Sequence, residues 1–481
     1  MFENSREHAH ATRRVFLAGT AAGTGATLVG LPTAAHAAGA HDSGEDWPDG
    51  PGRPNRPQVP DAELRSILRA IDPHRIEANV RKLASFGTRH TLSSQNDPTR
   101  GIGAARDWIF DTMSSYAAAS DGRMTVEKQS YVQEADGDRI PVDTVITNVL
   151  ATLRGSRDPD RVYLISGHYD SRVTDVMNST ADAPGADDDA SGVAVSMELA
   201  RVFATHEPGA TLIFAAVAGE EQGLYGSDHM AQVLQDQGVD VQGMFTNDIV
   251  GSSTADDGTR DPHSLRLFAE GVPTAETEDE ANVRRSVGGE NDSPARQLAR
   301  FVTEVADNRA TDMRVRVIYR RDRYLRGGDQ IPFLERGLPA ARFTEPNENY
   351  AHQHQDVRVQ DGVQFGDLPE FCDFDFIARV ARVNAATLWS LAMAPGTPKN
   401  ARVDTRALDN NTALSWDAVP GAAGYEVVWR PTIEDDWTHV IRVSGTSAVV
   451  DLSKDNVFFA VRSVDAQGRR SPAAFPTPKP A

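Results

Sequence analysis

Three consecutive aspartates, Asp187, Asp188 and Asp189, stand between glycines in the stretch APGADDDASG. Adjacent carboxylates repel one another, so a chain gains no stability from placing them together. One interpretation is a solvated acidic loop, which is the common role of a run of charges. The other is a metal site, because divalent cations are bound by closely spaced anionic oxygens. The run alone leaves both interpretations open.

Other candidate ligands stand at the ends of apolar runs elsewhere in the chain. They are His168 and Asp170 after YLISG, Glu220 and Glu221 after LIFAAVA, Asp248 at the end of GMFTND, and His352 and His354 in AHQHQD. Each has an ordinary alternative: an H-x-D motif can be a capped turn, adjacent glutamates suit the start of a helix, and a late histidine is usually on the surface. Together, however, they supply two histidines and at least three carboxylates. That set suits a pair of zinc ions that share one carboxylate.

The H-x-D pair predicts a specific contact at the end of its strand. Residues two apart in a strand point to the same side. Asp170 can therefore hydrogen-bond to His168 and fix its tautomer, as carboxylates commonly do for histidines that bind metals.

The elements that must position these residues alternate between expected strands and expected helices. The expected strands are 147–155, 160–171, 210–218, 241–250 and 339–345, and the expected helices are 191–206, 220–237 and 293–309. Such alternation predicts an α/β fold, a three-layer sandwich around a mostly parallel central sheet. Ligands bind at the carboxyl ends of the strands in sheets of this kind. The candidate residues fall at those ends, so we expect them to meet.

The composition excludes some classes of partner and cross-link. The chain has 481 residues and a formal net charge of −20, which disfavours nucleic acid as a partner because phosphates attract basic surfaces. Its single cysteine, Cys372, cannot form an intramolecular disulfide, and a small buried side chain is the simplest role for it. The length suggests more than one domain.

The first 37 residues have the features of a signal peptide. Arg13 and Arg14 form a twin-arginine pair before a weakly apolar stretch, and residues 35–37 (Ala-His-Ala) fit a small-x-small cleavage site. The stretch is short and rich in Gly, Ala and Thr, which favours a cleaved signal over a stable membrane anchor. We therefore expect export by the twin-arginine pathway to a secreted or extracytoplasmic location. Residues 38–60 are dense in Pro, Gly and charge, and they are expected to be a flexible linker.

Two later segments break the α/β pattern. Residues 272–292 are polar, acidic and long for a connection, so they are expected to form a mobile surface loop, with a lid as the alternative. Beyond the boundary in APGTPK, short strands with turn signals predict a small β-sandwich over residues 396–481. We expect Trp416 and Trp429 to lie in its core. The chain is thus expected to combine an α/β domain over residues 61–395 with this smaller domain.

Several motifs resemble one known family in order, type and spacing. They are HYDS, APGADDDASGVA, AGEEQGLYGS, an Asn-Asp pair before a loop, and a late histidine before an aspartate. Over roughly residues 61–395 the chain resembles the secreted bacterial leucyl aminopeptidases, which are dizinc exopeptidases. The resemblance implies the zinc exopeptidase fold and two Zn2+ per chain.

The resemblance also implies a role for each candidate residue. His168 and Asp248 would bind the first zinc, Glu221 and His352 the second, Asp188 would bridge both, Glu220 would be the general base, and Asp170 would orient His168. His352 is preferred to His354 because the family histidine stands four residues before an aspartate, here Asp356.

The sequence departs from the family at several positions. Some members have a disulfide near the substrate pocket, which a single cysteine cannot form. The family's Ser-Asp-His segment is replaced by Gly328-Asp329-Gln330, so the side-chain preference for the substrate does not follow from the resemblance. Residues 396–481 resemble a fibronectin type III domain less specifically, because Val457 stands where a corner tyrosine is common.

The function implied by the resemblance is that of a zinc-dependent aminopeptidase. It would hydrolyse the first bond of peptides with a free N-terminus by means of a water activated by two zinc ions. A glutaminyl cyclase is one alternative, since that family shares the fold but uses one zinc and cyclises its substrate. A non-catalytic relative is another, although all the expected ligand positions are intact. Metal content would separate the first two, with near two ions per chain for the peptidase and near one for the cyclase.

Overall fold

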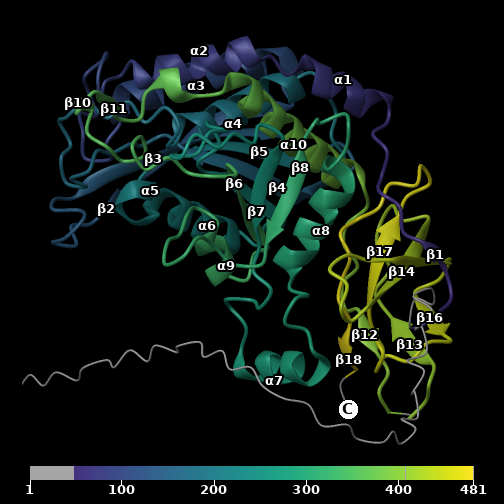
Figure 1. Ribbon diagram of the computed structural model, residues 1–481. Coiled ribbons are helices and arrows are strands. Elements are labelled where there is room, and N and C mark those ends of the chain that lie inside the picture. The colour runs from purple at the N-terminus through teal and green to yellow at the C-terminus, as the bar shows by residue number, and fades with distance from the viewer. Residues whose placement is uncertain (1–47, 407, 480–481) are drawn as a thin grey trace, which may run out of the picture. The chain divides into compact units, whose positions relative to one another are not determined.

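An eight-stranded sheet forms the centre of the computed structural model, which describes residues 48–406 and 408–479 (Figure 1). In spatial order its strands are β2 (Met124–Gln133), β3 (Thr144–Leu153), β5 (Ala210–Val217), β4 (Asp158–His168), β6 (Asp240–Asn247), β9 (Ala340–Thr344), β7 (Ser264–Phe268) and β8 (Arg314–Ile318). The central strands β5, β4, β6 and β9 pair in parallel. Three pairs nearer the edges, β2 with β3, β3 with β5 and β7 with β9, are antiparallel. The predicted α/β fold is confirmed, and its sheet is mixed with a parallel centre.

Helices cover both faces of this sheet, which gives three layers (Figure 1). One face carries α1 (Ala62–Ala70), α2 (Pro73–Ala84), α3 (Ile102–Ala117) with the short η1 (Ala118–Ser120), α4 (Ala190–Phe203), α8 (Pro294–Ala306) and α10 (Phe374–Met393); the other carries α5 (Glu220–Gly223), α6 (Tyr225–Asp236) and α9 (Ile331–Glu335). Strand β4 contributes to both cores, because Tyr163 and Ile165 pack in the first and Val162 and Leu164 in the second. Successive side chains of a strand point to opposite faces, which explains the continuous apolar run of β4.

The segment 220–237, expected to be one helix, is divided into α5 and α6. Leu224 lies between them with a φ of 60°, in the left-handed region that leucine rarely adopts. The N–H of Tyr225 donates to the carbonyl of Gly219 at 3.0 Å and closes the turn. As a result, Glu220 and Glu221 stand in a single helical turn directly after β5.

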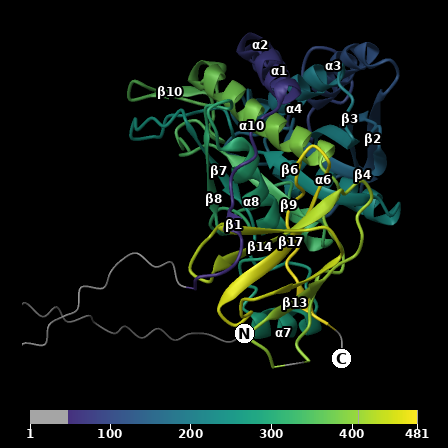
Figure 2. The same cartoon turned by 90° about the vertical axis from the view of Figure 1, so that its right-hand side faces the viewer.

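Two smaller four-stranded sheets make up the C-terminal region, where Figure 2 shows β14 and β17 side by side. The first has the order β1 (Arg53–Pro54), β15 (His439–Val443), β14 (Gly424–Pro431) and β17 (Val457–Val464); the second has β16 (Ser447–Val450), β13 (Thr412–Ser415), β12 (Arg402–Val403) and β18 (Thr477–Pro478). Trp416 and Trp429 lie in their core, as predicted. Strand β1 comes from the segment expected to be a flexible linker, and the indole of Trp429 also donates to the carbonyl of Pro51 at 2.8 Å.

The acidic segment 272–292 contains α7 (Glu278–Val287), which begins with a capping box between Thr277 and Glu280. Helix α7 lies beside β18. Its residues share a cleft of about 900 Å³ with Asp240 and Val241, at the start of β6. The candidate ligand Asp248 follows the other end of β6. The segment therefore forms an ordered helix at the far end of the strand, which differs from the expected mobile loop and from a lid over the candidate ligands.

The remaining elements lie on the connections around the sheet. Strands β10 (Arg358–Gln360) and β11 (Val363–Phe365) form a hairpin, and η2 (Pro369–Phe371) follows it.

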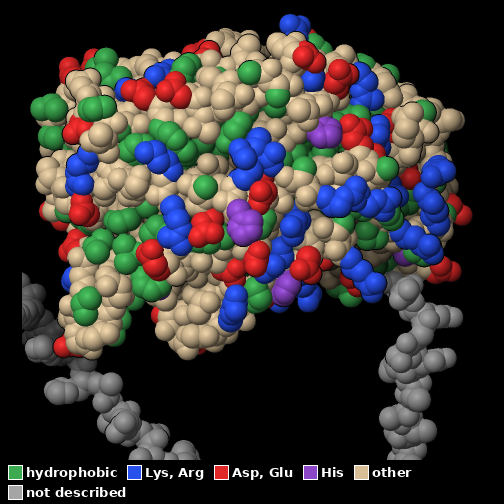
Figure 3. Space-filling view, turned by 90° about the horizontal axis from the view of Figure 1, so that it is seen from above, with side chains coloured by type: hydrophobic (Ala, Val, Ile, Leu, Met, Phe, Trp, Pro, Cys, Tyr) green, Lys and Arg blue, Asp and Glu red, His purple; other side chains and the backbone are tan. Residues whose placement is uncertain are grey.

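Among the residues that the structure describes, no helix is both long and apolar enough to cross a membrane. Residues 1–37, for which a twin-arginine signal is predicted, lie outside the described residues. On the face seen in Figure 3 acidic and basic side chains are interspersed, so the excess of acid is not gathered into one patch there.

Candidate metal centre

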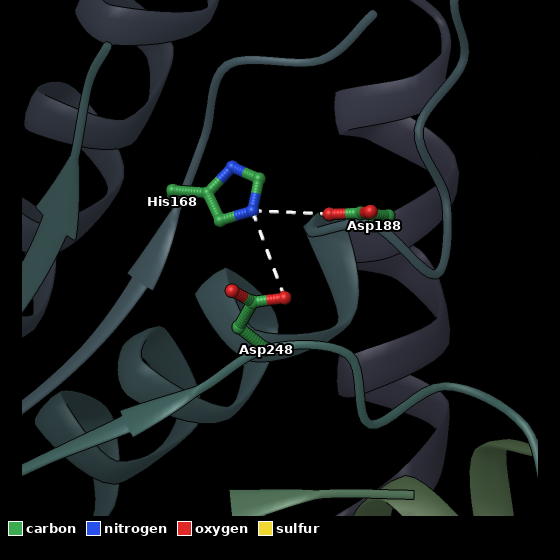
Figure 4. A group of neighbouring side chains, drawn as sticks. All are labelled: His168, Asp188 and Asp248. Atoms are coloured by element: carbon green, nitrogen blue, oxygen red, sulfur yellow. Dashed lines mark ion pairs between the residues drawn. The ribbon is translucent and has the colours of Figure 1, made fainter. Parts of the chain in front are cut away.

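Three candidate residues converge at the carboxyl end of the parallel strands. His168 is the last residue of β4, Asp248 follows β6, and Asp188 stands in the loop before α4 (Figure 4). The Nε2 atom of His168 lies 3.0 Å from Asp188 Oδ1 and 3.9 Å from Asp248 Oδ1. All three side chains are buried. One imidazole and two carboxylates in this arrangement form a group that could hold a metal ion.

A second group shares Asp188 with the first. The Nε2 atom of His354 lies 2.9 Å from Asp188 Oδ2 and 3.0 Å from Glu221 Oε1. Asp188 thus directs one carboxylate oxygen to His168 and the other to His354. This is the geometry of a carboxylate that bridges two cations, each with one histidine and one further carboxylate.

The histidine of this second group is His354, and the choice of His352 from the sequence is wrong. The ring of His352 stacks on Phe371 with 3.7 Å between centroids, and it belongs to no candidate metal group among the described residues. His354 has a φ of 56°, and its carbonyl accepts a hydrogen bond from Thr174 Oγ1 at 3.1 Å. The turn, and not the distance to the next aspartate, decides which histidine faces Asp188.

Asp170 holds two parts of the centre together. Its Oδ1 atom lies 3.5 Å from His168 Nδ1, and its backbone carbonyl lies 3.2 Å from the same nitrogen. The backbone N–H groups of Glu220 and Glu221 donate to its carboxylate at 3.3 and 3.1 Å. Burial opposes ionisation, but His168 and a hydrogen bond from Thr91 lower the pKa of Asp170. An ionised Asp170 can therefore orient His168, as the sequence predicts, and also fix the glutamate turn.

Glu220 is a carboxylate in a crowded acidic environment. Burial raises its pKa well above the ordinary value, His168 opposes the rise, and the charges of Asp248, Glu221 and Asp329 add to it. A raised pKa suits a carboxylate that must accept and release a proton. A third candidate metal group consists of Glu220, His168 and Glu221. The distances alone therefore do not distinguish whether Glu220 carries a proton or binds a metal.

The outer aspartates of the triplet bind backbone groups. Asp189 accepts the N–H of His168 at 2.9 Å and, at the start of α4, the N–H of Gly192 at 3.0 Å. Asp187 accepts the N–H of Gly251 at 2.6 Å. Of the three aspartates, Asp188 therefore faces both histidines, while Asp187 and Asp189 hold the backbone segments around it. This division of roles explains why three carboxylates stand together in the sequence.

Comparison with known proteins agrees with this geometry. The model of peptidase family M28 matches residues 148–360. A probable zinc metalloprotease of Pyricularia oryzae is 57% identical over 430 residues, which cover 88% of this chain and 86% of the relative. A probable zinc metalloprotease of Pyrenophora teres f. teres is 55% identical over 455 residues, which cover 93% and 94%. The chain belongs to peptidase family M28.

The fold of this M28 peptidase is also found in a solved structure. The aminopeptidase LapA of Legionella pneumophila aligns with a TM-score of 0.50 and 17% identity, over 71% of this chain and 78% of that one. At that identity the likeness concerns the fold alone. The family that the motifs resemble is thus shown as peptidase family M28. The two relatives that match most of the chain come from fungi.

A buried arginine of this M28 peptidase, which the sequence patterns do not predict, contacts a candidate ligand. Arg342 in β9 donates from Nη2 to Asp248 Oδ1 at 2.8 Å and from Nη1 to the carbonyl of Gly327 at 2.9 Å. A Cβ atom on Gly328 would lie 2.5 Å from that Nη1 atom, so glycine leaves the room that the guanidinium needs. A charged residue inside the apolar stretch PAARFTE was the available signal.

The change from histidine to glutamine in the same segment fits this arrangement. Gln330 Nε2 donates to Asp322 Oδ2 at 2.6 Å, and that carboxylate oxygen lies 3.6 Å from Arg342 Nη1. Gly328 and Gln330, which depart from the pattern of the bacterial aminopeptidases, therefore both support the position of Arg342.

The donor atoms of the M28 centre fit divalent cations. Imidazole nitrogens with carboxylate oxygens are the ligands that zinc uses in catalytic sites. Glu221 Oε1 and His354 Nε2 are buried atoms that lie 3.0 Å apart. Burial opposes protonation of His354, but Glu221 and Asp188 raise its pKa to about 11, which shows how strongly this position favours a positive charge. The residues present therefore match the metal that the names of the two relatives mention.

Proposed function

We propose that this chain is a zinc-dependent aminopeptidase, a metallo-exopeptidase that removes the first residue of peptides with a free N-terminus. One observation carries the proposal: Asp188 presents one oxygen to His168 and the other to His354, so that two cations can share it. His168 and Asp248 would hold the first Zn2+, and Glu221 and His354 would hold the second. A single-zinc site needs no shared carboxylate, which favours the peptidase over a glutaminyl cyclase.

The chemistry divides between the cations and the side chains of the chain. When bound, a pair of zinc ions polarises a carbonyl and makes a water molecule more acidic. Glu220 accepts the proton of the attacking water and later donates it to the leaving amine, which its raised pKa permits. Asp170 keeps His168 in one tautomer, because its carboxylate lies beside Nδ1 and leaves Nε2 to face Asp188.

The acidic surroundings support the preference for a free N-terminus. Asp329 is completely buried, and its carboxylate is close enough to add to the rise in the pKa of Glu220. A positively charged amine is attracted by such a group of carboxylates, whereas an acetylated terminus is not.

Aminoacyl-nitroanilides test the proposed activity. The purified chain should hydrolyse them, lose activity in the presence of a chelator and recover it with added zinc. N-acetylated analogues should remain intact. Elemental analysis should give about two zinc ions per chain. One ion, together with the release of cyclised products from N-terminal glutamine, would instead support the cyclase.

The same proposal includes export and a role for the C-terminal sheets. Arg13 and Arg14 support export of the folded enzyme by the twin-arginine pathway, and replacement of both by lysine should retain the precursor in the cytoplasm.

Residues 396–481, as a fibronectin type III-like module, would act mainly as a structural partner of the peptidase. Their packing against α8 supports this role, because it buries charged side chains on both sides.

A further inference from the structure

The loop that carries Asp188 is gripped from one side by a buried arginine. Arg89, which follows α2, is not exposed at all. Its guanidinium donates from Nη1 to the carbonyl of Pro184 at 2.5 Å and from Nη2 to the carbonyl of Gly185 at 2.8 Å. Its Nε atom donates to the carbonyl of Tyr169, between His168 and Asp170, at 2.6 Å. One cation thus joins the loop of the bridging aspartate to the end of β4.

A buried aspartate holds the same loop from the other side. The Oδ1 atom of Asp367 accepts the N–H of Asp187 at 2.8 Å, and its Oδ2 atom accepts the N–H of Asp188 at 2.8 Å. Asp367 precedes η2 and lies 179 residues from Asp188 in the chain. The carbonyls of residues 184 and 185 and the amides of residues 187 and 188 are therefore all bound by two side chains of opposite charge.

The placement of these two charges requires a reason. Transfer of an ion from water into the interior is unfavourable unless it is paired and hydrogen-bonded. Among the described residues, the Arg89 guanidinium donates to carbonyl groups and to no carboxylate, and Asp367 is the first of the nearby carboxylates that favour its charge. The loop is also closely packed at Gly185, because a Cβ there would lie 2.6 Å from the carbonyl oxygen of Asp188.

We propose that Arg89 and Asp367 are positioning residues that hold loop 184–188 so that Asp188 can present one oxygen to each metal. Neither side chain belongs to a candidate metal group among the described residues. Their effect passes through the backbone of the loop, which fixes where Asp188 begins. A shared carboxylate tolerates displacement poorly, since productive sites are held to within about 0.5 Å. The inference rests on the proposed two-metal centre.

The principal test is Asp367→Asn in the full-length chain, titrated with Co2+ after removal of metal. An amide offers one acceptor oxygen, and its NH2 group would face a backbone N–H that needs an acceptor. We expect one cation to bind nearly as before and the second to bind about 10- to 100-fold more weakly, the usual effect of losing a group that orients a ligand. At saturation, the magnetic coupling between the two Co2+ ions should be weakened, because the bridge is displaced.

Two further variants separate positioning from a general loss of stability. Arg89→Lys keeps the charge but cannot reach three separate carbonyls, so it should reproduce the weaker second affinity. Asp373→Asn is the matched control, because Asp373 caps α10 close to Asp367 in sequence and asparagine also caps helices well. This control should bind both ions like the wild type.

The outcomes distinguish this inference from the proposed function. A wild-type chain that binds only one Co2+ would overturn both. Two ions in the wild type, with the same affinities and coupling in Asp367→Asn or Arg89→Lys, would overturn the positioning role alone. A variant that melts earlier without metal, but gains as much stability from Co2+ as the wild type, would show that the clamp is merely structural. Should Asp367→Asn not fold, the titration of Arg89→Lys decides.

Discussion

Two buried groups of charges in this protein are balanced in different ways. The metal centre contains more carboxylates than cationic side chains. The junction cluster, where α8 meets strands β14 and β17 of the C-terminal region, pairs each carboxylate with arginine. Its members are Asp292, Arg300, Glu304, Glu426, Arg430, Arg462 and Arg470. The junction cluster is thus neutralised within the chain, whereas the centre has an excess of negative charge that cations could balance.

The junction cluster satisfies its own charges. Arg300 Nη1 pairs with Oδ1 of Asp292 and Arg430 Nη2 with its Oδ2, each at a distance of 2.8 Å. Glu426 is 2.8 Å from Arg462. Burial opposes ionisation of Glu426, but Arg462 and its neighbouring arginines lower the pKa of that carboxyl. Such a cluster fixes the C-terminal sheets against α8 and balances its own charges.

The metal centre shows the reverse pattern. Burial raises the pKa of Glu220 and Asp187, and neighbouring carboxylates add to both shifts. His168 has a pKa well above its ordinary value, because the surrounding carboxylates outweigh the effect of its burial. Carboxylates and imidazoles that all gain from positive charge mark a place for cations. The imbalance therefore favours bound cations, whereas the balance at the junction is structural.

The largest expected effect comes from breaking the balance at the junction. Asp292→Asn should lower the free energy of unfolding by about 3–5 kcal/mol, because Arg300 and Arg430 would stay buried without their counter-charge. Denaturant unfolding measures the change, and the metal content should not fall. Asp404→Asn is the control, since its partner Arg406 is exposed and solvent screens their attraction, so the loss should be far smaller than that of Asp292→Asn. Equal losses in the two variants would refute the structural role of the junction.

The next effect concerns adjacent carboxylates with different roles in the metal centre. Glu220→Gln cannot accept a proton, so turnover should fall by at least about 100-fold while about two ions remain bound. Glu221→Gln should instead weaken the second metal, because a neutral amide is a poorer ligand than a carboxylate, and added zinc should restore part of its activity. Elemental analysis and turnover on one substrate check both. Loss of metal in Glu220→Gln with retention in Glu221→Gln would show that the roles are reversed.

The sequence alone identifies those parts of the centre that local pattern determines. His168, Glu220 and Asp248 follow apolar strands, and the carboxyl ends of parallel strands meet at one edge. The choice between His352 and His354 depended on one turn with a positive φ, which no spacing rule encodes. His352 stands four residues before Asp356 and His354 only two, so the spacing favoured the histidine that does not face Asp188.

Other elements escaped prediction because their signals are not local. Strands β7 and β8 carry arginines among their apolar residues, as in SLRLF and RVRVI, which weakens the apolar pattern. Asp367 lies far from Asp188 in the chain and acts on backbone groups. Segment 272–292 was too polar to suggest packing, yet α7 is stabilised by its cap and by the pair of Arg284 with Glu276 at 2.8 Å.

A smaller effect is expected where an arginine does reach the metal centre. Gly328→Ser restores the residue of the bacterial aminopeptidases, but its Cβ would press against Arg342. Displacement of the guanidinium should weaken the first metal by about 10-fold, the usual effect of disturbing a group that holds a ligand. Gly445→Ala is the control, because nothing lies within 4 Å of a Cβ there. A metal titration with equal affinities for both variants would show that Arg342 does not hold Asp248.

The smallest effect is a difference in pH dependence between the two groups of charges. Glu345, the residue after β9, is buried near Asp187. The folded pKa of Glu220 and Glu345 lies above the ordinary 4.5, and that of His168 lies above 6.5, so these groups bind protons more tightly in the folded metal-free chain than in the unfolded chain. Stability of the metal-free protein should therefore fall as the pH rises from about 5 to about 8. The pKa shift of Glu426 has the opposite sign. Because this pKa is lowered, the carboxylate contributes stability above about pH 4.5, and that stability is lost at lower pH.

Melting temperatures with chelator and with excess zinc test this difference. With chelator, the melting temperature should decrease steadily between about pH 5 and pH 8, because the acids with raised pKa values become charged and repel one another while His168 loses the positive charge that offsets them. With zinc, the decrease should be much smaller, since the cations replace those protons. Glu426→Gln should leave this range unchanged and flatten only the loss below about pH 4.5. If zinc left the slope as steep as the chelator does, the excess of carboxylates in the centre would not be a site for cations.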